Sequence, residues 1–350
     1  MVAQFSEKNI SLLLVGFGNV GRALARLILR KQPELRTQFG WNIQVNGILT
    51  NRHGCAIDPA GIQLTRALEL VKNGLPLDTL SANPPPVDPV EFIYACPAQV
   101  IMETTPVNHH TGEPALTYLR TGIYKGMHAI TANKGPVVHG YHELTALADS
   151  RKRRFLFESA VMDGAPIFSL FREPLPLVNV TSFQGILNSC TNLLLGMLEE
   201  GKTLDEAIAY GQSIGITETD PSADIDGWDA AIKVAALSTV IMGIPLKPQE
   251  VEREGIRGIT PEMIADAKAS GERWKLVCTA RRQGPRLLEA SVGPQRITPS
   301  SPLYAINGTS SYVQFTTDVL PGLGIVESNP DPDTTAYGML ADLINAMRGC

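Results

Sequence analysis

Residues 10–31, ISLLLVGFGNVGRALARLILRK, place an apolar run, a glycine-rich turn and a helical pattern directly one after another. The run at 10–15 is short and continuous, which is typical of a parallel strand covered on both faces. After the turn, apolar residues at 23, 24, 27 and 28 follow the spacing of one helix face. The order of strand, turn and helix predicts that the chain begins with a doubly wound α/β sheet.

Three glycines in this turn have separate tasks. Gly16 permits the tight turn, Gly18 lets the backbone approach a pyrophosphate, and Gly21 lets the helix pack on the strand. The first helical residues, Asn19 and Val20, contribute backbone amides at the positive end of the helix dipole. A glycine motif alone also fits a plain turn, but its place between strand and helix predicts a dinucleotide site.

The next expected strand, IQVNGILTNR at 43–52, indicates which dinucleotide binds. It ends without the acidic residue that would hydrogen-bond a ribose 2′-hydroxyl, and Thr50, Asn51 and Arg52 stand there instead. An arginine can pair with a 2′-phosphate, so the sequence favours NADP(H). If Arg52 points into solvent, the protein accepts either cofactor, and NAD(H) stays the alternative.

Two further segments end a strand in polar residues. QVIMETTPVN at 99–108 is typical of a buried strand that breaks into a loop, and HAITANKGPV at 128–137 of a strand followed by Lys134. Ligands collect at the carboxyl edge of a doubly wound sheet. We therefore expect Thr104, Thr105 and Lys134 at that edge, near a nicotinamide.

Residues 218–239, ETDPSADIDGWDAAIKVAALST, change abruptly from a carboxylate-rich segment to an apolar one. Proline, glycine and aspartate predict a loop, followed by a helix that begins near Trp228 with Asp226 or Gly227 as its N-cap. The alanines leave this helix slim enough for close packing, so we expect Lys233 to be partly desolvated. Asp229 lies four residues earlier and therefore on the same helix face.

Two interpretations of the pair Asp229 and Lys233 stay open on physical grounds, a structural ion pair and a catalytic pair. Hydride transfer favours the second. When a nicotinamide reduces a carbonyl, negative charge grows on the oxygen and a proton must reach it. A lysine held by a carboxylate can supply that proton and take it back in the reverse direction.

The bulk composition limits the partners of the chain. Its 350 residues predict two domains, and a net charge of −5 with one short basic run, RKRR at 151–154, argues against a nucleic-acid partner. We interpret that run as a solvated linker. Five scattered cysteines favour a reducing, cytoplasmic compartment, and no apolar window is long enough to predict a membrane partner. His109 and His110 lack a third ligand at metal-binding spacing.

The ordered motifs GFGNVG, ETTPVN, TANKGPV, ESAVMDGAPI, ILNSCTN and ETDPSADIDGWDAAIKVA resemble the homoserine dehydrogenase family over nearly the whole chain. The resemblance implies a Rossmann-type doubly wound parallel sheet in residues 1–150, completed by 325–350, and an α+β substrate and dimerisation domain in residues 151–324. It also implies a cytoplasmic homodimer that interconverts L-homoserine and L-aspartate 4-semialdehyde with NAD(P), on the route to threonine and methionine.

The resemblance also implies roles for single residues in the reaction. Lys233 would be the proton donor and acceptor, with Asp229 as its orienting partner. Glu218 and Asp224 would bind the substrate ammonium, and Lys134 would lie beside nicotinamide and substrate. The remaining residues implied near a ligand are Thr191 and Asn192 for the substrate and Gly324, in a glycine turn, for the cofactor.

A monovalent cation, Na+ or K+, is a further implication of the resemblance. Its oxygen ligands would be Glu158 and backbone carbonyls around Val161, Asp163 and Ala165. Oxygen ligands suit such a hard cation. The alternative for Glu158 is a plain carboxylate at the end of a strand.

The chain departs from the family pattern beside the implied substrate, where Ser189 and Cys190 replace the usual glycine and threonine. Two alternatives therefore stay open: a related oxidoreductase for another small hydroxy acid or amino alcohol, and a catalytically silent NADPH-binding protein. The segment after residue 320 resembles the family's return to the first domain. We expect no regulatory domain beyond it and no feedback inhibition by threonine.

Overall fold

The apolar run that opens the sequence forms strand β1 (Lys8–Val15), and the helical pattern after it forms helix α1 (Asn19–Phe39). Leu12 of the strand belongs to one apolar core with Leu24 of the helix. Leu13 is equally buried but faces the opposite side, because successive strand residues alternate. Both faces of β1 are therefore covered, which explains its continuous apolar composition.

The structure is a computed structural model that describes residues 7–217 and 220–348. The chain divides into one unit of Met1–Gly164 with Asp331–Cys350 and a second unit of Ala165–Pro330. Both boundaries lie later than the 150 and 324 predicted from the sequence. Residues after 150 still add strand β6 (Phe155–Leu156) to the first sheet, and strand β12 (Leu323–Glu327) of the second sheet extends beyond 324.

The first unit contains a sheet in the order β3-β2-β1-β4-β5-β6. Strands β2, β1, β4, β5 and β6 each run parallel to their neighbours in this order, whereas β3 pairs with β2 in the antiparallel direction. Its other strands are β2 (Trp41–Leu49), β3 (Cys55–Ile57), β4 (Val100–Glu103) and β5 (His128–Thr131).

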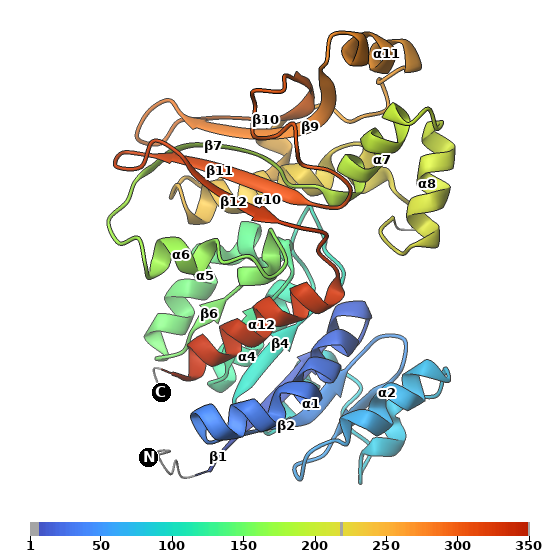
Figure 1. Ribbon diagram of the computed structural model, residues 1–350. Coiled ribbons are helices and arrows are strands. Elements are labelled where there is room, and N and C mark those ends of the chain that lie inside the picture. Colours follow the sequence, from blue (N-terminus) through green and yellow to red (C-terminus); the bar gives the residue numbers. More distant parts are fainter. Residues whose placement is uncertain (1–6, 218–219, 349–350) are drawn as a thin grey trace. The chain divides into compact units, whose positions relative to one another are not determined.

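Helices cover both faces of this sheet. Helix α1 lies beside α12 (Figure 1) and shares its core with α2, whereas α4 packs against α3 and α5. The expected Rossmann-type doubly wound sheet is confirmed. The helices are α2 (Leu64–Lys72), α3 (Pro89–Ala95), α4 (Ala115–Lys125), α5 (Lys134–Ser150) and α12 (Pro332–Met347), with short 3₁₀ turns at η1 (Leu77–Leu80) and η2 (Glu158–Ala160).

The glycine turn between β1 and α1 is sterically specified at two of its three glycines. Gly16 has a φ of 95°, and a Cβ there would lie 2.7 Å from Thr104 Oγ1. A Cβ on Gly21 would lie 2.5 Å from the carbonyl oxygen of Gly16. A Cβ on Gly18 would meet nothing within 4 Å, so the backbone there faces open space.

The second unit contains a sheet in the order β12-β11-β7-β9-β10-β8, and helices α7 and α10 both contact β9. Neighbouring strands run antiparallel apart from β8, which is parallel to β10. Its other strands are β7 (Val180–Ile186), β8 (Glu252–Arg253), β9 (Arg273–Arg282), β10 (Leu288–Ile297) and β11 (Ser311–Thr317). Its helices are α6 (Phe168–Arg172), α7 (Ser189–Glu199), α8 (Leu204–Ser213), α9 (Ser222–Ile225), α10 (Trp228–Val240), α11 (Pro261–Ala269) and the 3₁₀ turn η3 (Pro248–Glu250).

Residues 222–225 of the carboxylate-rich segment are helical, which their composition did not predict. A one-turn helix, α9, forms where the sequence predicted only loop, because four backbone hydrogen bonds close it between Pro221 and Gly227. Gly227 then precedes α10 with a φ of 79°, so one of the two predicted N-cap residues is confirmed. Across the described residues, no helix is long and apolar enough to cross a membrane.

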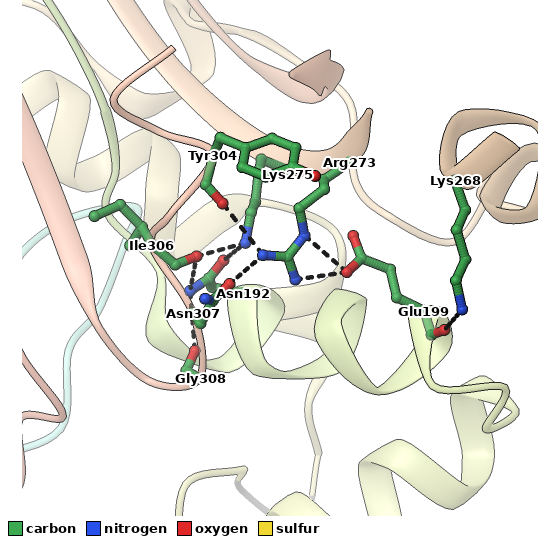
Figure 2. Close-up of polar contacts among 9 residues, drawn as sticks. All are labelled: Asn192, Glu199, Lys268, Arg273, Lys275, Tyr304, Ile306, Asn307 and Gly308. Atoms are coloured by element: carbon green, nitrogen blue, oxygen red, sulfur yellow. Dashed lines mark hydrogen bonds and ion pairs between the residues drawn. The ribbon is translucent and has the colours of Figure 1, made fainter. Parts of the chain in front are cut away.

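A buried lysine ties helix α7 to the loop before β11. Lys275 is 1% exposed, and its Nζ donates to Asn192 Oδ1 at 2.8 Å and to the Ile306 carbonyl at 2.5 Å (Figure 2). The amide nitrogen of Asn192 donates to the carbonyl oxygens of Gly308 at 3.0 Å and of Ser310 at 3.3 Å. This network fixes the first turn of α7 against residues 306–310.

The surroundings of Lys275 disfavour its charged form. Its two hydrogen-bond acceptors are neutral, and the nearest carboxylate, Glu199, is engaged by Arg273 Nη2 at 2.5 Å (Figure 2). Burial first, and the positive charge of Arg273 second, lower the pKa of Lys275 to about 8, against a small opposing effect of Glu199.

We predict that Lys275 makes the free energy of unfolding depend on pH. In the unfolded chain the lysine has a pKa of 10.5, whereas in the folded protein its pKa is about 8. Between about pH 8 and pH 10.5 unfolding therefore takes up a proton, and the free energy of unfolding rises with pH. Relative to Lys275→Met, the parent should gain up to about 3 kcal/mol across this window, measured by denaturant unfolding. The exposed Lys268 gives the control, Lys268→Met, which should keep the parental slope. Parallel curves for the parent and Lys275→Met would refute the assignment.

Candidate active site

The predicted pair on α10 forms as an ion pair inside the second unit. Lys233 Nζ lies 3.2 Å from Asp229 Oδ2, and the two side chains are 12% and 16% exposed. Nζ also donates to the carbonyl oxygen of Leu187 at 2.6 Å. The expected partial desolvation of Lys233 and its contact with Asp229 are therefore confirmed, and Leu187 is an additional partner from the segment before α7.

Asn188, which was not predicted from the sequence, connects this pair to α9. The amide nitrogen of Asn188 donates to Asp224 Oδ1 at 2.6 Å and to Asp229 Oδ2 at 2.9 Å. Asn188 is also the N-cap of α7, and its oxygen accepts the N–H of Thr191 at 2.7 Å. An asparagine directly before a predicted helix is a recognisable capping signal, but the two carboxylates are distant in sequence.

Two thiols line this polar cluster without adding charge. Cys190 Sγ lies 3.3 Å from Thr217 Oγ1, and its pKa is raised to about 12 by burial and by the negative charge of Asp224. Burial likewise raises the pKa of Cys278, on β9 near Lys233, to about 12. Both thiols therefore stay protonated around neutral pH, so Cys190 acts as a small, weakly polar neighbour.

The residues that the resemblance implies for substrate binding differ in their place in the structure. Asp224 lies on α9 beside Asn188, whereas Glu218 falls outside the described residues. Thr191 is fully buried, and its hydroxyl donates back to Asn188 Oδ1 at 2.8 Å. Asn192 is engaged by Lys275 and the loop at 306–310. The side chains of Thr191 and Asn192 thus bind protein groups, and their implied substrate contacts stay predictions.

In the first unit, the open glycine turn is followed by exposed residues that suit an anion. Gly18 and Asn19 are exposed at the start of α1, and the side-chain oxygen of Asn19 accepts a hydrogen bond from Arg22 at 2.8 Å. Val20, the next residue, is half-buried. Backbone amides and the positive end of a helix dipole converge at this point, which fits a pyrophosphate.

The two threonines after β4 are held by the protein rather than pointing freely outward. Thr104 Oγ1 donates to the Gly16 carbonyl at 3.2 Å. Thr105 donates its backbone N–H to Glu103 Oε1 at 2.6 Å, and Thr131 donates its hydroxyl to Glu103 Oε2 at 2.5 Å. Glu103 is fully buried, and burial raises its pKa above the usual range despite these donors. Glu103 was not predicted as an anchor, although its position as the last residue of an apolar strand could have indicated it.

Lys134 and Arg52 occupy two different parts of the first unit. Lys134 is the first residue of α5 and is half-buried, directly after Asn133, whose amide donates to the Thr105 carbonyl at 3.1 Å. The segments carrying Thr105 and Lys134 therefore meet at the carboxyl edge of β4 and β5, as predicted. Arg52 is exposed in the turn between β2 and β3.

Two other expectations concern Gly324 and the cation. Gly324 lies within strand β12 of the second unit, opposite Gln314, and a Cβ there would approach Tyr312 Oη to 2.7 Å. Its glycine identity thus has a packing reason, and its cofactor contact stays a prediction. Within the part of the chain that the structure describes, no group of three or more His, Cys, Asp or Glu side chains is placed to hold a metal ion.

The residues of the expected cation site have protein contacts of their own. Glu158 is buried, and its backbone N–H donates to Asp342 Oδ2 at 2.7 Å. Asp163 Oδ1 accepts the Thr335 hydroxyl at 2.5 Å. Val161 is buried after η2, and Ala165 begins the second unit. The monovalent cation stays a prediction.

Comparison with known proteins agrees with this geometry. The family model for homoserine dehydrogenase matches residues 166–344. An NAD(+)-dependent homoserine dehydrogenase of Pseudomonas canavaninivorans is 33% identical over 341 residues, 95% of each chain. A homoserine dehydrogenase of Methanocaldococcus jannaschii is 32% identical over 96% of this chain and 98% of its own.

A solved structure extends the likeness to three dimensions. A hyperthermophilic archaeal homoserine dehydrogenase in complex with NADPH superposes with a TM-score of 0.82 at 29% identity, covering 98% of this chain and 99% of that one. The relatives and the solved structure match over nearly the full length, and the family model matches the second half of the chain. The chain belongs to the homoserine dehydrogenase family.

Proposed function

We propose that the protein is an NAD(P)-dependent homoserine dehydrogenase, which interconverts L-homoserine and L-aspartate 4-semialdehyde by hydride transfer. The observation that carries this proposal is the largely buried ion pair of Lys233 and Asp229, with Asp224 beside it. A solvated surface pair would be mostly exposed and contribute little, whereas this one is partly desolvated and lies next to a second carboxylate. The family's place on the route to threonine and methionine gives the reaction its context.

The cofactor fits the residues of the first unit. Gly18 leaves space for a close approach, and the start of α1 offers amides to a pyrophosphate. Among the similar proteins, one is named as NAD(+)-dependent and another is in complex with NADPH. When bound, NAD(P) supplies the hydride donor or acceptor of the reaction. We favour NADP(H) because the exposed Arg52 stands where a 2′-phosphate would need a cation.

Lys233 handles the proton in the proposed mechanism. In the reductive direction its ammonium donates a proton to the carbonyl oxygen of the substrate, and in the oxidative direction its amine takes the proton from the hydroxyl. Asp229 Oδ2 and the Leu187 carbonyl orient Nζ by holding it from two sides. The amino group of the substrate is a cation, for which Asp224 and Glu218 are the proposed partners.

Several finer features rest on the family resemblance and stay proposals. These are the contact of Lys134 with nicotinamide and substrate, the homodimer, the cytoplasmic location and the monovalent cation at Glu158.

We predict that Lys233→Met lowers kcat for the reduction of L-aspartate 4-semialdehyde by about a hundredfold or more, since a positioned acid/base group contributes that much. Dissociation constants for NADPH, measured by fluorescence titration, should be unchanged. Lys202→Met removes an exposed lysine of the same unit and should retain the parental kcat. Undiminished turnover in Lys233→Met would rule out its role as the proton carrier.

We predict that Arg52→Ala weakens NADPH binding about tenfold and leaves NADH binding unchanged, because only NADPH carries the 2′-phosphate. The measurement is the dissociation constant of each cofactor by calorimetry. Arg30→Ala, which removes an exposed arginine of α1, should change neither value. Equal losses for both cofactors, or no loss for either, would show that Arg52 does not read the 2′-phosphate.

A further inference from the structure

The side chain of Asn188 has a single permitted orientation. Its Oδ1 accepts the backbone N–H of Thr191 at 2.7 Å, and a backbone N–H can only donate. The amide nitrogen must therefore face the other way, toward Asp224 at 2.6 Å and Asp229 at 2.9 Å. Because the Thr191 contact fixes the flip of the amide, the bridge between the two carboxylates does not depend on an arbitrary assignment.

This geometry uses both N–H groups of the amide, one for each carboxylate. Asn188 is 4% exposed, so its hydrogen bonds are shielded from water. Two carboxylates in one desolvated place repel each other, and one of them would tend to take up a proton. A neutral donor between them offsets part of this repulsion.

The two carboxylates have different proposed tasks. Asp229 Oδ2 accepts both the Asn188 amide at 2.9 Å and the Lys233 ammonium at 3.2 Å, so a single oxygen carries both contacts. Asp224 is the proposed partner of the substrate's amino group. One amide therefore fixes the spacing between the proton-handling pair and the residue that binds the amino end.

We infer that Asn188 is a positioning residue, which holds Asp224 and Asp229 at a fixed spacing so that the carboxylate for the substrate's amino group and the ammonium of Lys233 meet the same substrate molecule. This inference rests on the proposed function for its kinetic consequence. Its structural part, the bridge itself, can be tested without substrate.

The other titratable groups against this bridge are few in the described part of the chain. Lys233 faces it from α10, Cys190 from α7 and Cys278 from β9. Both thiols stay neutral below about pH 10 because burial raises each pKa to about 12. A change in stability between about pH 5 and pH 8 that depends on residue 188 therefore reports the carboxylates.

Two substitutions separate the bridge from the helix cap. Asn188→Asp keeps the shape and the capping oxygen but replaces the amide donor by an acceptor oxygen and so adds a third carboxylate. Asn188→Ser keeps an N-cap, since serine caps well, but its short single hydroxyl cannot reach both carboxylates. Thr203→Ala is the matched control, because it removes the N-cap of α8 at a distance from the site.

We predict that the Tm of Asn188→Asp falls relative to the parent as pH rises from about 5 to about 8. Repulsion raises the folded pKa of the carboxyl cluster above its unfolded value, so stability is present at low pH and lost as pH rises through the folded pKa. The Tm offset of Asn188→Ser should change with pH in the same direction but less, because the two carboxylates lose a neutral donor without gaining a third carboxylate. The offset of Thr203→Ala should not change with pH. A pH-independent offset for Asn188→Asp overturns the bridge, and this readout requires no turnover.

The kinetic prediction is that Asn188→Ser raises KM for L-aspartate 4-semialdehyde and lowers kcat, with at least about a tenfold loss in kcat/KM. NADPH affinity should be retained, and Thr203→Ala should keep the parental kcat and KM. Parental kinetics in Asn188→Ser overturn the positioning role. If the parent itself lacks this activity, the proposed function fails, and the pH dependence of Tm still decides whether the bridge exists.

Discussion

The site in the second unit depends on the partners of one partly buried ammonium group, that of Lys233. Lys233 sits in an apolar helix, where an unpaired charge would be strongly unfavourable. Asp229 on the same helix and the Leu187 carbonyl before α7 supply those partners. Satisfying one charge therefore fixes where α7 begins, and the start of α7 brings Asn188 between the two carboxylates. Breaking such a pair on one side costs more than the pair contributes, so the arrangement is strongly constrained.

Lys275 and Lys233 differ in the groups that they contact, and this difference sets the role that we assign to each. Lys275 is held by an amide oxygen and a backbone carbonyl, and its pKa is lowered to about 8. Lys233 instead touches a carboxylate that is in turn hydrogen-bonded by Asn188. We interpret Lys275 as an internal tie that fixes α7 through Asn192, and Lys233 as the group that meets substrate. Both lysines hold helix α7: Lys275 contacts Asn192 in its first turn, and Lys233 contacts the Leu187 carbonyl just before it begins.

Sequence patterns predicted the features that depend on local geometry. The order of strand, glycine turn and helix predicted β1 and α1, and helical spacing predicted the contact of Asp229 with Lys233. The bridge by Asn188 was missed because its partners lie 36 and 41 residues away. The pairing of β6 with β5, which moves the unit boundary, is likewise a tertiary contact without a local signal. Residue types indicated the chemistry, whereas the contacts that orient it come from the fold.

The central claim is that the buried pair serves a substrate with both an alcohol and an amino group. The most direct measurement is steady-state oxidation of L-homoserine beside 4-hydroxybutanoate, which lacks the amino group, with NAD+ and NADP+ in parallel. The account predicts robust turnover of L-homoserine, release of L-aspartate 4-semialdehyde, and a loss of about a hundredfold or more in kcat/KM without the amino group, as expected when the carboxylates that bind it lose their cation. Negligible oxidation of L-homoserine with both cofactors, or equal rates for the two alcohols, would contradict it.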